Sequence, residues 1–347
     1  MVLDLQNDDF IVNINVVAVR ILKGNGDSHL NIVGSKLTEM VLVSNIMMLN
    51  EKERFDETIR KCNYEPIWAE ADQFLDEKQC LELVGEIDGW LAGDDRITRR
   101  VLEKALPRLR IISKWGTGLD SIDLKAAEDL GVPVKNSSGA FANAVAEVAI
   151  HYMLSLGRQL VKVDRAVRAG QWPKPQGIEL SGGTLGMIGF GAIGQRIAEL
   201  ATCFRMDVLF YDPFVAEPVD IGGKTAHPVQ VAELAAQSDY VCLACSYNES
   251  NHHIVDDAFL RRLKPTAFVL NVARGPLVDE QALIRALEEK RIAGVGLDVF
   301  EAEPLSPDNP LIKMENVVLG SHNANNSRAA VEYVHKNTLD NLISILG

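Results

Sequence analysis

Five polar side chains that could do chemistry stand near the ends of apolar runs in the last third of the chain. Arg274 closes one run, the acids Asp298, Glu301 and Glu303 follow a second, and His322 follows a third. Ligands of an open α/β sheet bind beyond the carboxyl ends of its strands. A guanidinium binds a carboxylate through two parallel hydrogen bonds, and an imidazole oriented by a carboxylate accepts a hydroxyl proton. The set predicts oxidation of a 2-hydroxy acid, in which hydride leaves C2 as the imidazole takes the proton.

A glycine-rich segment in the middle of the chain has the G-x-G-x-x-G spacing of a dinucleotide-binding loop. Gly189, Gly191 and Gly194 lie between a predicted strand at 184–188 and a predicted helix at about 192–203. The first glycine permits a tight turn, the second lets the backbone approach a pyrophosphate, and the third lets helix and strand pack closely. The helix N-terminus offers free N–H groups and the positive end of its dipole to the diphosphate. A glycine-rich turn without a nucleotide is the alternative.

An acidic residue follows at the position where such sites bind ribose. Asp212 ends the next predicted strand, roughly 20 residues beyond the glycines, where an acid accepts hydrogen bonds from the ribose hydroxyls. It also repels a 2′-phosphate, and no arginine stands beside it. The sequence therefore predicts NAD rather than NADP as cofactor.

Strand-like and helix-like runs alternate on both sides of a long helical stretch, predicted at 141–167. Before it we predict strands at 41–45, 65–69, 89–93 and 109–114 and helices at about 51–61, 77–85 and 98–105, and after it a second such series from 183 to about 319. Strands joined by helices through short connections form parallel sheets covered on both faces. The prediction is an α/β protein with two Rossmann-like or flavodoxin-like lobes.

The order of these runs predicts that one lobe is inserted in the other. The last predicted helix, 327–345, has no partner lobe of its own in the sequence and is expected to return to the first lobe. The NAD-binding lobe, 141–324, then interrupts a substrate-binding lobe made of 41–140 and 325–347.

Residues 1–40 differ from the regular alternation that follows. A strand-like run at 10–19 leads to a loop-like run at 24–28. We interpret residues 1–40 as an appendage, or as a segment upstream of a natural start at Met40.

Taken together, these segments resemble the D-isomer-specific 2-hydroxyacid dehydrogenase family. The resemblance covers about residues 41–345 and rests on an ordered set of motifs rather than on any one of them. The motifs are K-W-G-T-G-L-D-S-I-D at 114–123, the segment 136–147, the dinucleotide loop, N-V-A-R-G at 271–275, L-D-V-F-E-A-E-P at 297–304 and the final His322.

The resemblance implies roles for individual residues. Arg274, Glu303 and His322 would form the catalytic triad, since the acid of this family precedes the proline of D-V-F-x-x-E-P, which selects Glu303 over Glu301. Asp298 would contact the nicotinamide carboxamide. The cofactor contacts expected beyond the three glycines and Asp212 are those of Thr117, Ala192, Ile193, Cys245, Ala273 and Asp298, and the expected substrate contacts are those of Lys114, Thr117, Gly118 and Arg274.

Two departures from the family pattern bear on the substrate. Where members usually carry proline before the histidine, this chain has Ser321, and three asparagines follow at 323, 325 and 326, so we expect a loop rich in hydrogen bonds.

The second departure lies in the early loop where phosphoglycerate members place an arginine. The matching position here is Ala92, with Asp94 and Asp95 beside it, which argues against a phosphorylated substrate. Arg96 and Lys114 remain candidate anion contacts, and Lys114 is the better one because it ends a strand beside the loop at 117–118.

Two alternative functions stay open at this point. Some members of the superfamily act as NAD-sensing corepressors that bind partner peptides and can retain the triad, but this chain has no long tail suited to such binding. Formate or phosphite oxidation would require additional pocket residues that we do not find. A homodimer is expected from the resemblance, through the helical stretch at 141–167.

Other polar and aromatic residues have ordinary interpretations. We interpret His252 and His253 as surface residues, His151 as helix packing and Glu301 as solvated. Trp115 is open to two interpretations, as a pocket wall or as packing of its loop.

The composition excludes several classes of protein. Apolar residues make up 47% and charged residues 24% of the 347, as in a folded globular chain. The formal charge of −13 would repel a phosphate backbone or an anionic membrane. No apolar stretch approaches the ~20 residues of a membrane helix. We predict neither a nucleic-acid nor a membrane partner, and no metal site.

The five cysteines are odd in number, which argues against a disulfide framework and fits a reducing, cytoplasmic setting. Cys242 and Cys245 are spaced as C-x-x-C but lie within a strand-like run at 239–245, where that spacing places thiols on opposite faces. We interpret them as core cysteines rather than a redox pair.

Overall fold

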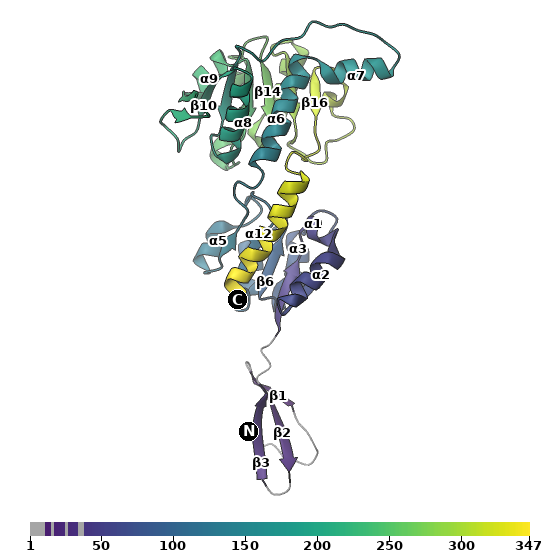
Figure 1. Cartoon of the computed structure of the whole chain (residues 1–347), viewed down its shortest axis with the longest axis vertical. Helices are drawn as coiled ribbons and strands as arrows, with labels where there is room; N and C mark the ends of the chain where they lie inside the picture. The colour runs from purple at the N-terminus through teal and green to yellow at the C-terminus, as the bar shows by residue number, and fades with distance from the viewer. Residues whose placement is uncertain (1–10, 15–16, 25–26, 34–37) are drawn as a thin grey trace. The chain divides into compact units, whose positions relative to one another are not determined.

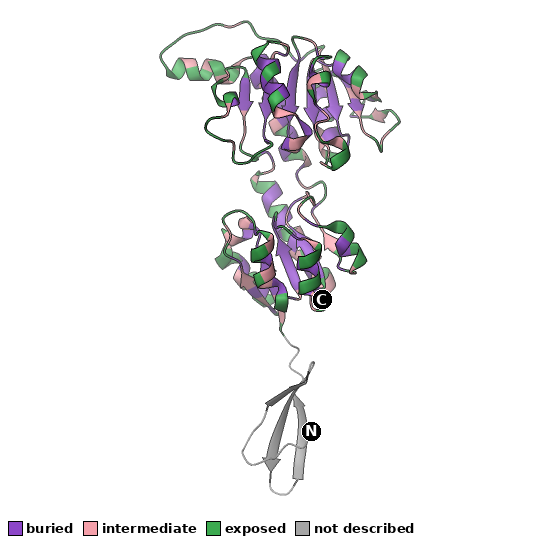
Figure 2. Cartoon of the chain, turned by 180° about the vertical axis from the view of Figure 1, so that it is seen from behind, coloured by how far each residue is buried: buried purple, intermediate pink, exposed green. Residues whose placement is uncertain are grey.

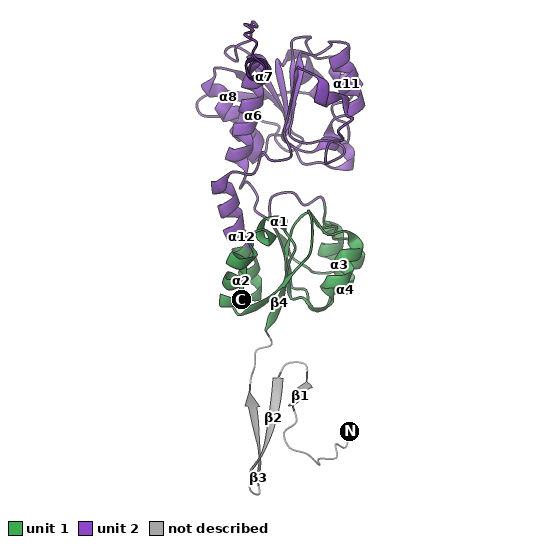
Figure 3. Ribbon diagram, turned by 90° about the vertical axis from the view of Figure 1, so that its right-hand side faces the viewer, with its two compact units in different colours: residues 1–114, 121–135, 339–347 green, residues 115–120, 136–338 purple. Residues whose placement is uncertain are grey.

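The computed structural model describes the backbone of residues 11–14, 17–24, 27–33 and 38–347, with side chains from residue 38 onward. The chain divides into two compact units (Figure 3). Unit 1 contains residues 1–114, 121–135 and 339–347, and unit 2 contains 115–120 and 136–338. Unit 2 therefore interrupts unit 1 in the sequence. The assignment of NAD binding to one predicted lobe and of substrate binding to the other stays a prediction.

Unit 1 is built on a five-stranded parallel sheet with the order β5-β4-β6-β7-β8. This is the 2-1-3-4-5 order of a flavodoxin-like sheet. The strands are β4 (Glu39–Val43), β5 (Tyr64–Trp68), β6 (Gly89–Ala92), β7 (Ile111–Lys114) and β8 (Val134–Lys135), and the helices are α1 (Ile46–Leu49), α2 (Lys52–Lys61), α3 (Glu77–Leu83), α4 (Arg99–Ala105) and α5 (Leu124–Asp129), with a 3-10 turn, η1, at Val84–Glu86.

The last helix of the chain packs on this sheet. α12 (Arg328–Leu346) ends in unit 1, where a Cβ on Gly89 would lie 2.6 Å from a methyl carbon of Leu342 and 2.9 Å from one of Leu346. A side chain at Gly89 would require these leucines to shift, so the helix packs closely on β6.

Unit 2 is built on an eight-stranded sheet with the order β11-β12-β10-β9-β13-β14-β15-β16. From β12 to β15 it follows the 3-2-1-4-5-6 order of a Rossmann sheet, and only the edge pair β11–β12 is antiparallel. The strands are β9 (Thr184–Ile188), β10 (Asp207–Tyr211), β11 (Val219–Asp220), β12 (Thr225–Pro228), β13 (Tyr240–Leu243), β14 (Phe268–Asn271), β15 (Gly294–Leu297) and β16 (Val317–Leu319).

Helices cover both faces of this sheet, so its central strands are buried throughout (Figure 2). One core lies between the sheet and the helices α6 and α8, and a second core lies on the side of α9, α10 and α11. The helices of unit 2 are α6 (Ala142–Gly157), α7 (Leu160–Arg168), α8 (Ala192–Cys203), α9 (Val231–Gln237), α10 (Asp257–Leu260), α11 (Glu280–Glu288) and the first part of α12, with 3-10 turns η2 (Glu249–Asn251), η3 (Gly275–Leu277) and η4 (Pro310–Lys313).

The single helix predicted at 141–167 is wrong, because the structure contains two helices there (Figure 1). α6 ends at Gly157, where a Cβ would lie 2.5 Å from the hydroxyl of Tyr240, and Gln159 then takes a left-handed conformation with φ 55°. The interpretation of His151 as packing is also wrong, since this residue of α6 is exposed.

The predicted strand at 10–19 is also two strands. β1 (Ile11–Ile14), β2 (Val17–Gly24) and β3 (Asp27–Val33) form an antiparallel sheet, and the predicted loop at 24–28 contains the end of β2 and the start of β3. Residues 15–16 and 25–26 lie outside the described part of the chain.

Within the described residues, no helix is both long enough and apolar enough to span a bilayer.

Candidate active site

A histidine and a glutamate meet beyond the carboxyl ends of β15 and β16. Nδ1 of His322 lies 2.7 Å from Oε2 of Glu303, and the other carboxylate oxygen accepts the N–H of Phe300 at 2.9 Å. With Nδ1 bound to the carboxylate, Nε2 is the ring nitrogen left for a substrate. The side chains are 43% and 35% exposed, so solutes can reach them.

The two groups shift each other's protonation in the direction that acid–base catalysis needs. The hydrogen bond to Glu303 raises the pKa of His322 above its ordinary value, against the opposing effect of burial. Burial acts to raise the pKa of Glu303, but the hydrogen bonds from His322 and the Phe300 N–H outweigh it, and the pKa is lowered. The pair therefore favours an imidazolium beside a carboxylate.

Arg274 follows β14 and acts electrostatically on the same pair. Its charge lowers the pKa of both Glu303 and His322. Its Nε donates to Oδ2 of Asp120 at 3.0 Å, and its Nη1 donates to the carbonyl of Ala273 at 2.8 Å. The structure thus brings the three residues of the predicted triad to one edge of the unit 2 sheet.

The predicted substrate loop at 115–120 lies against this arginine. A Cβ on Gly118 would lie 2.2 Å from Nη2 of Arg274, so a side chain there would require the guanidinium to shift. The loop is fixed by Asn136, whose side-chain amide donates to the carbonyl of Thr117 at 2.7 Å. Trp115 packs its loop, with its indole N–H donating to Nδ1 of His335 at 3.1 Å.

The glycine-rich loop has the shape that a diphosphate requires. Gly189 has φ 93°, and a Cβ there would lie 2.6 Å from the backbone nitrogen of Cys245. A Cβ on Gly194 would lie 2.3 Å from the carbonyl oxygen of Gly189. Gly191 precedes α8 without a side-chain cap, and a Cβ there would meet no atom within 4 Å. Close packing on one side and open space at a helix N-terminus fit the pyrophosphate of a dinucleotide.

The remaining cofactor candidates border the same loop. Oδ2 of Asp212 accepts the N–H of Phe190 at 2.7 Å, and Oδ1 accepts the N–H of Phe214 at 2.9 Å. Each carboxylate oxygen can accept further hydrogen bonds, so ribose hydroxyls fit this carboxylate. Ala192 and Ile193 form the first turn of α8. Cys242 is buried in β13 and Cys245 lies beyond its end, and both are free thiols.

Asp298 lies differently from the other predicted cofactor contacts. It is 3% exposed, and its two carboxylate oxygens accept the N–H groups of Asn323 at 3.2 Å and Ala324 at 2.9 Å. The carboxylate therefore binds the loop that carries His322.

In unit 1, Lys114 and the neighbouring acids form ion pairs and structural hydrogen bonds. Lys114 is 3% exposed and its Nζ lies 3.0 Å from a carboxylate oxygen of Asp94. Asp95 is fully buried and accepts the N–H groups of Leu75 and Gly93 at 2.9 and 2.8 Å. Of the two acids expected near the substrate, only Asp94 is exposed.

The interpretation of Glu301 as merely solvated is incomplete. Oε1 of Glu301 lies 2.5 Å from Nε2 of His253, whose ring stacks on that of His252 at 3.8 Å. Glu301 and Glu303 thus each face a different histidine.

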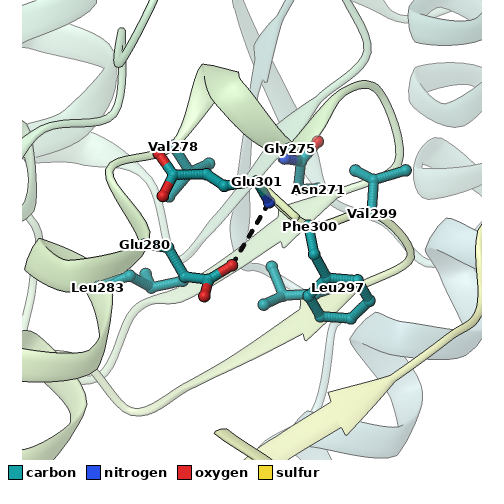
Figure 4. A pocket seen from close by; sticks show the side chains of 9 residues that line it. All are labelled: Asn271, Gly275, Val278, Glu280, Leu283, Leu297, Val299, Phe300 and Glu301. Atoms are coloured by element: carbon teal, nitrogen blue, oxygen red, sulfur yellow. Dashed lines mark hydrogen bonds between the residues drawn. The ribbon is translucent and has the colours of Figure 1, made fainter. Parts of the chain in front are cut away.

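A small pocket lies beside the loop at 299–301 (Figure 4). Its volume is about 10 Å³, about what one water molecule needs, so it does not accommodate a 2-keto acid. The N–H of Glu301 donates to Oε2 of Glu280 across it at 3.4 Å. The lining residues are Asn271, Gly275, Val278, Glu280, Leu283, Leu297, Val299, Phe300 and Glu301.

Sequence reasoning assigned no role to two residues of this site. Asp120, which holds Arg274, lies inside the motif at 114–123 and could have been chosen as the acid nearest its glycines. Tyr152, which contacts Asp298 at 3.3 Å, lies on α6 just beyond the motif segment 136–147, and no residue pattern points to it.

Comparison with known proteins adds an independent observation. The model of the NAD binding domain of D-isomer specific 2-hydroxyacid dehydrogenases matches residues 150–324. A glyoxylate reductase of Korarchaeum cryptofilum is 37% identical over 287 residues, covering 79% of this chain and 86% of that protein. A glyoxylate reductase of Pyrococcus horikoshii is 37% identical over 290 residues, with coverages of 79% and 86%.

Solved structures show the same likeness. A glyoxylate reductase from Paecilomyes thermophila superposes with a TM-score of 0.79 at 27% identity, covering 89% of this chain and 95% of that one. A D-lactate dehydrogenase from Aquifex aeolicus, complexed with NAD and lactic acid, superposes with a TM-score of 0.77 at 26% identity, covering 87% and 93%.

Proposed function

Because the chain belongs to the D-isomer-specific 2-hydroxyacid dehydrogenase family of NAD-dependent oxidoreductases, we propose that it reduces a small, unphosphorylated 2-keto acid to the D-2-hydroxy acid. The observation that carries the proposal is the 2.7 Å contact of His322 with Glu303, in the same unit as Arg274. The glyoxylate reductases among its relatives make glyoxylate the first substrate to test.

The residues divide the chemistry between them. Arg274 binds the substrate carboxylate, because its guanidinium lies against the loop that contains Gly118. His322 donates the proton from Nε2 to the C2 oxygen, and Glu303 stabilises the imidazolium before the transfer and orients the neutral ring afterwards. NADH, when bound at the glycine-rich loop, supplies the hydride that C2 receives. In the oxidation direction His322 accepts the hydroxyl proton instead.

The preference for NADH rests on Asp212. Its carboxylate follows β10 and is held in place by two backbone N–H groups. A 2′-phosphate next to a fixed carboxylate would be repelled, whereas ribose hydroxyls can donate to it.

The preference for an unphosphorylated acid rests on unit 1. Lys114, its best candidate anion contact, is paired with Asp94, and that acid is itself exposed. Because a carboxylate already balances the charge of Lys114, unit 1 is poorly suited to bind a dianionic phosphate at this lysine.

We also propose that the protein works as a homodimer through α7 and the segment that follows it. α7 has no buried residue, and Leu160, Trp172 and Ile178 are 50%, 78% and 46% exposed. Large apolar side chains gathered in one exposed segment mark an interaction surface, and a second copy of this chain would cover it.

The test is NADH oxidation with glyoxylate, hydroxypyruvate, pyruvate, 2-ketoglutarate and phosphohydroxypyruvate, comparing wild type with His322→Ala. We expect turnover of an unphosphorylated acid and a loss of about 10²- to 10⁴-fold in the variant. His227→Ala, which removes an exposed histidine of β12, serves as control. Preferred turnover of phosphohydroxypyruvate would contradict the substrate class. Tight NADH binding without any turnover would favour an NAD-sensing protein.

A further inference from the structure

One buried residue collects three consecutive N–H groups of the loop that carries the candidate acid–base. The carbonyl oxygen of Asp298 accepts the N–H of His322 at 2.7 Å, and its two carboxylate oxygens accept the N–H groups of Asn323 and Ala324. The loop after β16 is therefore wrapped around a single aspartate.

This wrapping explains the backbone conformation of the histidine. His322 has φ 54°, in the left-handed region that is unfavourable for a non-glycine residue. Such a conformation persists only where the surroundings over-determine it. The hydrogen bonds that the N–H groups of His322, Asn323 and Ala324 donate to Asp298 fix this conformation.

Tyr152 adds a further contact to the same carboxylate from a different element. It lies on α6, is 3% exposed, and its hydroxyl is 3.3 Å from Oδ1 of Asp298. Burial raises the pKa of Tyr152 well above its ordinary value, so the hydroxyl remains a donor at all ordinary pH values.

Two glycines make room for this tyrosine. A Cβ on Gly320 would lie 2.3 Å from the Tyr152 hydroxyl oxygen and 2.3 Å from Oδ1 of Asp298, and a Cβ on Gly296 would lie 2.8 Å from Cβ of Tyr152. Gly296 is in β15 and Gly320 precedes Ser321 and His322 in the loop after β16. Any larger residue at either position would displace the ring or its hydroxyl.

We propose that Tyr152 is a positioning residue, which holds His322 against Glu303 by fixing Asp298 and the loop wrapped around it. The proposal rests on the acid–base role assigned to His322 above, and it extends that role to α6, an element without a reacting group. The negative charge of Asp298 also raises the pKa of His322, so displacement of this carboxylate acts on the histidine by charge as well as by geometry.

The experiment compares Tyr152→Phe with Tyr240→Phe. Tyr240 is equally buried in unit 2, at 1% exposed, but its hydroxyl has no hydrogen-bond partner within the described residues. Each variant therefore removes one buried hydroxyl, and only one of the two hydroxyls contacts Asp298.

Three quantities are measured for wild type and both variants. They are the pKa of the His322 imidazole by NMR titration, kcat and KM for the 2-keto acid, and the Kd of NADH. In Tyr152→Phe we expect a lower pKa, because a loosened loop weakens the hydrogen bond to Glu303. We also expect a loss in kcat of roughly fivefold, the equivalent of one ordinary hydrogen bond, with the Kd of NADH unchanged. Tyr240→Phe is expected to match wild type in all three.

Each of the other outcomes either overturns the positioning role of Tyr152 or separates it from the proposed function. Equal titration and kcat in the two variants, or a Tyr152→Phe protein that does not fold, would show that the hydroxyl only fills the core and would overturn the proposal. A raised Kd of NADH with an unchanged titration would assign Asp298 to the nicotinamide alone and overturn it as well. If wild type turns over no 2-keto acid but the titration shifts only in Tyr152→Phe, the positioning stands and the proposed function fails.

Discussion

The pair of His322 and Glu303 determines in which pH range each direction of the reaction runs. The raised pKa of His322 keeps the imidazole protonated to higher pH than in a free histidine. Reduction requires that proton, so its rate falls as the pH rises through the pKa of the folded enzyme. Oxidation requires the neutral ring, so its rate falls as the pH drops through the same value.

Replacing Glu303 by Gln should change the pH at which the rate of reduction falls. The hydrogen bond to Glu303 is the largest influence that raises the pKa of His322, so its loss lowers that pKa. The basic limb of kcat/KM for reduction then shifts to lower pH, and kcat falls by about one to two orders of magnitude. The measurement is the pH profile of NADH oxidation at saturating NADH.

Glu301→Gln is the matched control for this change. Glu301 is two residues away, has the same side chain and is bound to His253 instead. We expect it to leave the profile in place. If Glu301→Gln moves the basic limb and Glu303→Gln does not, the assignment of the acid is wrong.

Asp120 should determine how well Arg274 is prepared for its substrate. The carboxylate accepts the Nε–H of Arg274, which leaves Nη2 and the second hydrogen of Nη1 for a bound carboxylate, since the other Nη1 hydrogen is donated to the carbonyl of Ala273. In Asp120→Ala the guanidinium loses this anchor, and the KM for the 2-keto acid should rise about tenfold, since orientation is no longer provided in advance. Asp120→Asn keeps an acceptor for Nε and should lie nearer wild type. A lower KM in Asp120→Ala would instead mean that Asp120 competes with the substrate for Arg274.

At the scale of elements, the dinucleotide loop contains two glycines that differ in the space available for a Cβ atom. A Cβ on Gly194 meets the Gly189 carbonyl, whereas a Cβ on Gly191 meets nothing and its φ of −73° suits any residue. Gly191→Ala should therefore keep the thermal stability of wild type and yet weaken NADH binding at least tenfold, because the methyl group occupies space that the diphosphate needs. Tm and the Kd of NADH, measured by fluorescence, check both statements.

Gly85→Ala is the control for Gly191→Ala. Gly85 lies in unit 1, outside the dinucleotide loop, and a Cβ there also meets no atom within 4 Å. It should leave both Tm and the Kd unchanged. Unweakened NADH binding in Gly191→Ala would place the diphosphate elsewhere.

The segment after α6 should set the oligomeric state. Replacing Leu160 and Trp172 by Ser removes the two most exposed apolar side chains of this segment, and we expect a dimer to become a monomer in light scattering after size exclusion. Phe214→Ser, at a side chain that is 93% exposed but outside the segment, should not change the mass. A wild-type monomer would contradict the dimer proposal.

The elements also show where sequence patterns suffice. The bounds predicted for β9 and α8 agree with the structure, because their glycines permit only one local geometry. The break between α6 and α7 was not predicted. Its cause is the close approach of Tyr240 to Gly157, a contact between residues far apart in sequence, and Gln159 carries no sign of its left-handed φ.

At the scale of the whole molecule, too, sequence patterns identify some residues of the site and miss those that are placed by long-range packing. Arg274, His322 and the acids after β15 could be identified because they follow strands of one parallel sheet, whose carboxyl ends lie at one edge. The choice of Glu303 over Glu301 came from the family resemblance alone. The roles of Asp120 and Tyr152 depend on where a loop and a helix pack on that edge, and the motifs do not encode this. Lys114, which we expect at the substrate, pairs with Asp94 in the structure, and its contact with a substrate stays a prediction.

The whole molecule provides a last prediction about its N-terminal segment. Among residues 38–347, whose side chains the structure describes, the buried apolar residues extend from Val41 to Leu346. We predict that removal of residues 1–37 leaves thermal stability and kcat/KM with a 2-keto acid unchanged. A chain that starts at Met40 should be slightly less stable. It lacks Glu39, whose carboxylate pairs with Arg110 at 2.6 Å, and an ion pair with one exposed partner contributes about 1 kcal/mol or less.

Thermal unfolding and NADH oxidation, measured on the full chain and on both shortened chains, test this order of stabilities. Met40 still supplies the N–H or amine that Asp88 accepts at 2.8 Å, so β4 retains its first contact with the rest of unit 1 even in the shorter chain. A large loss of stability or activity on removal of residues 1–37 alone would mean that they form part of the catalytic unit, and the interpretation of residues 1–40 as an appendage would be wrong.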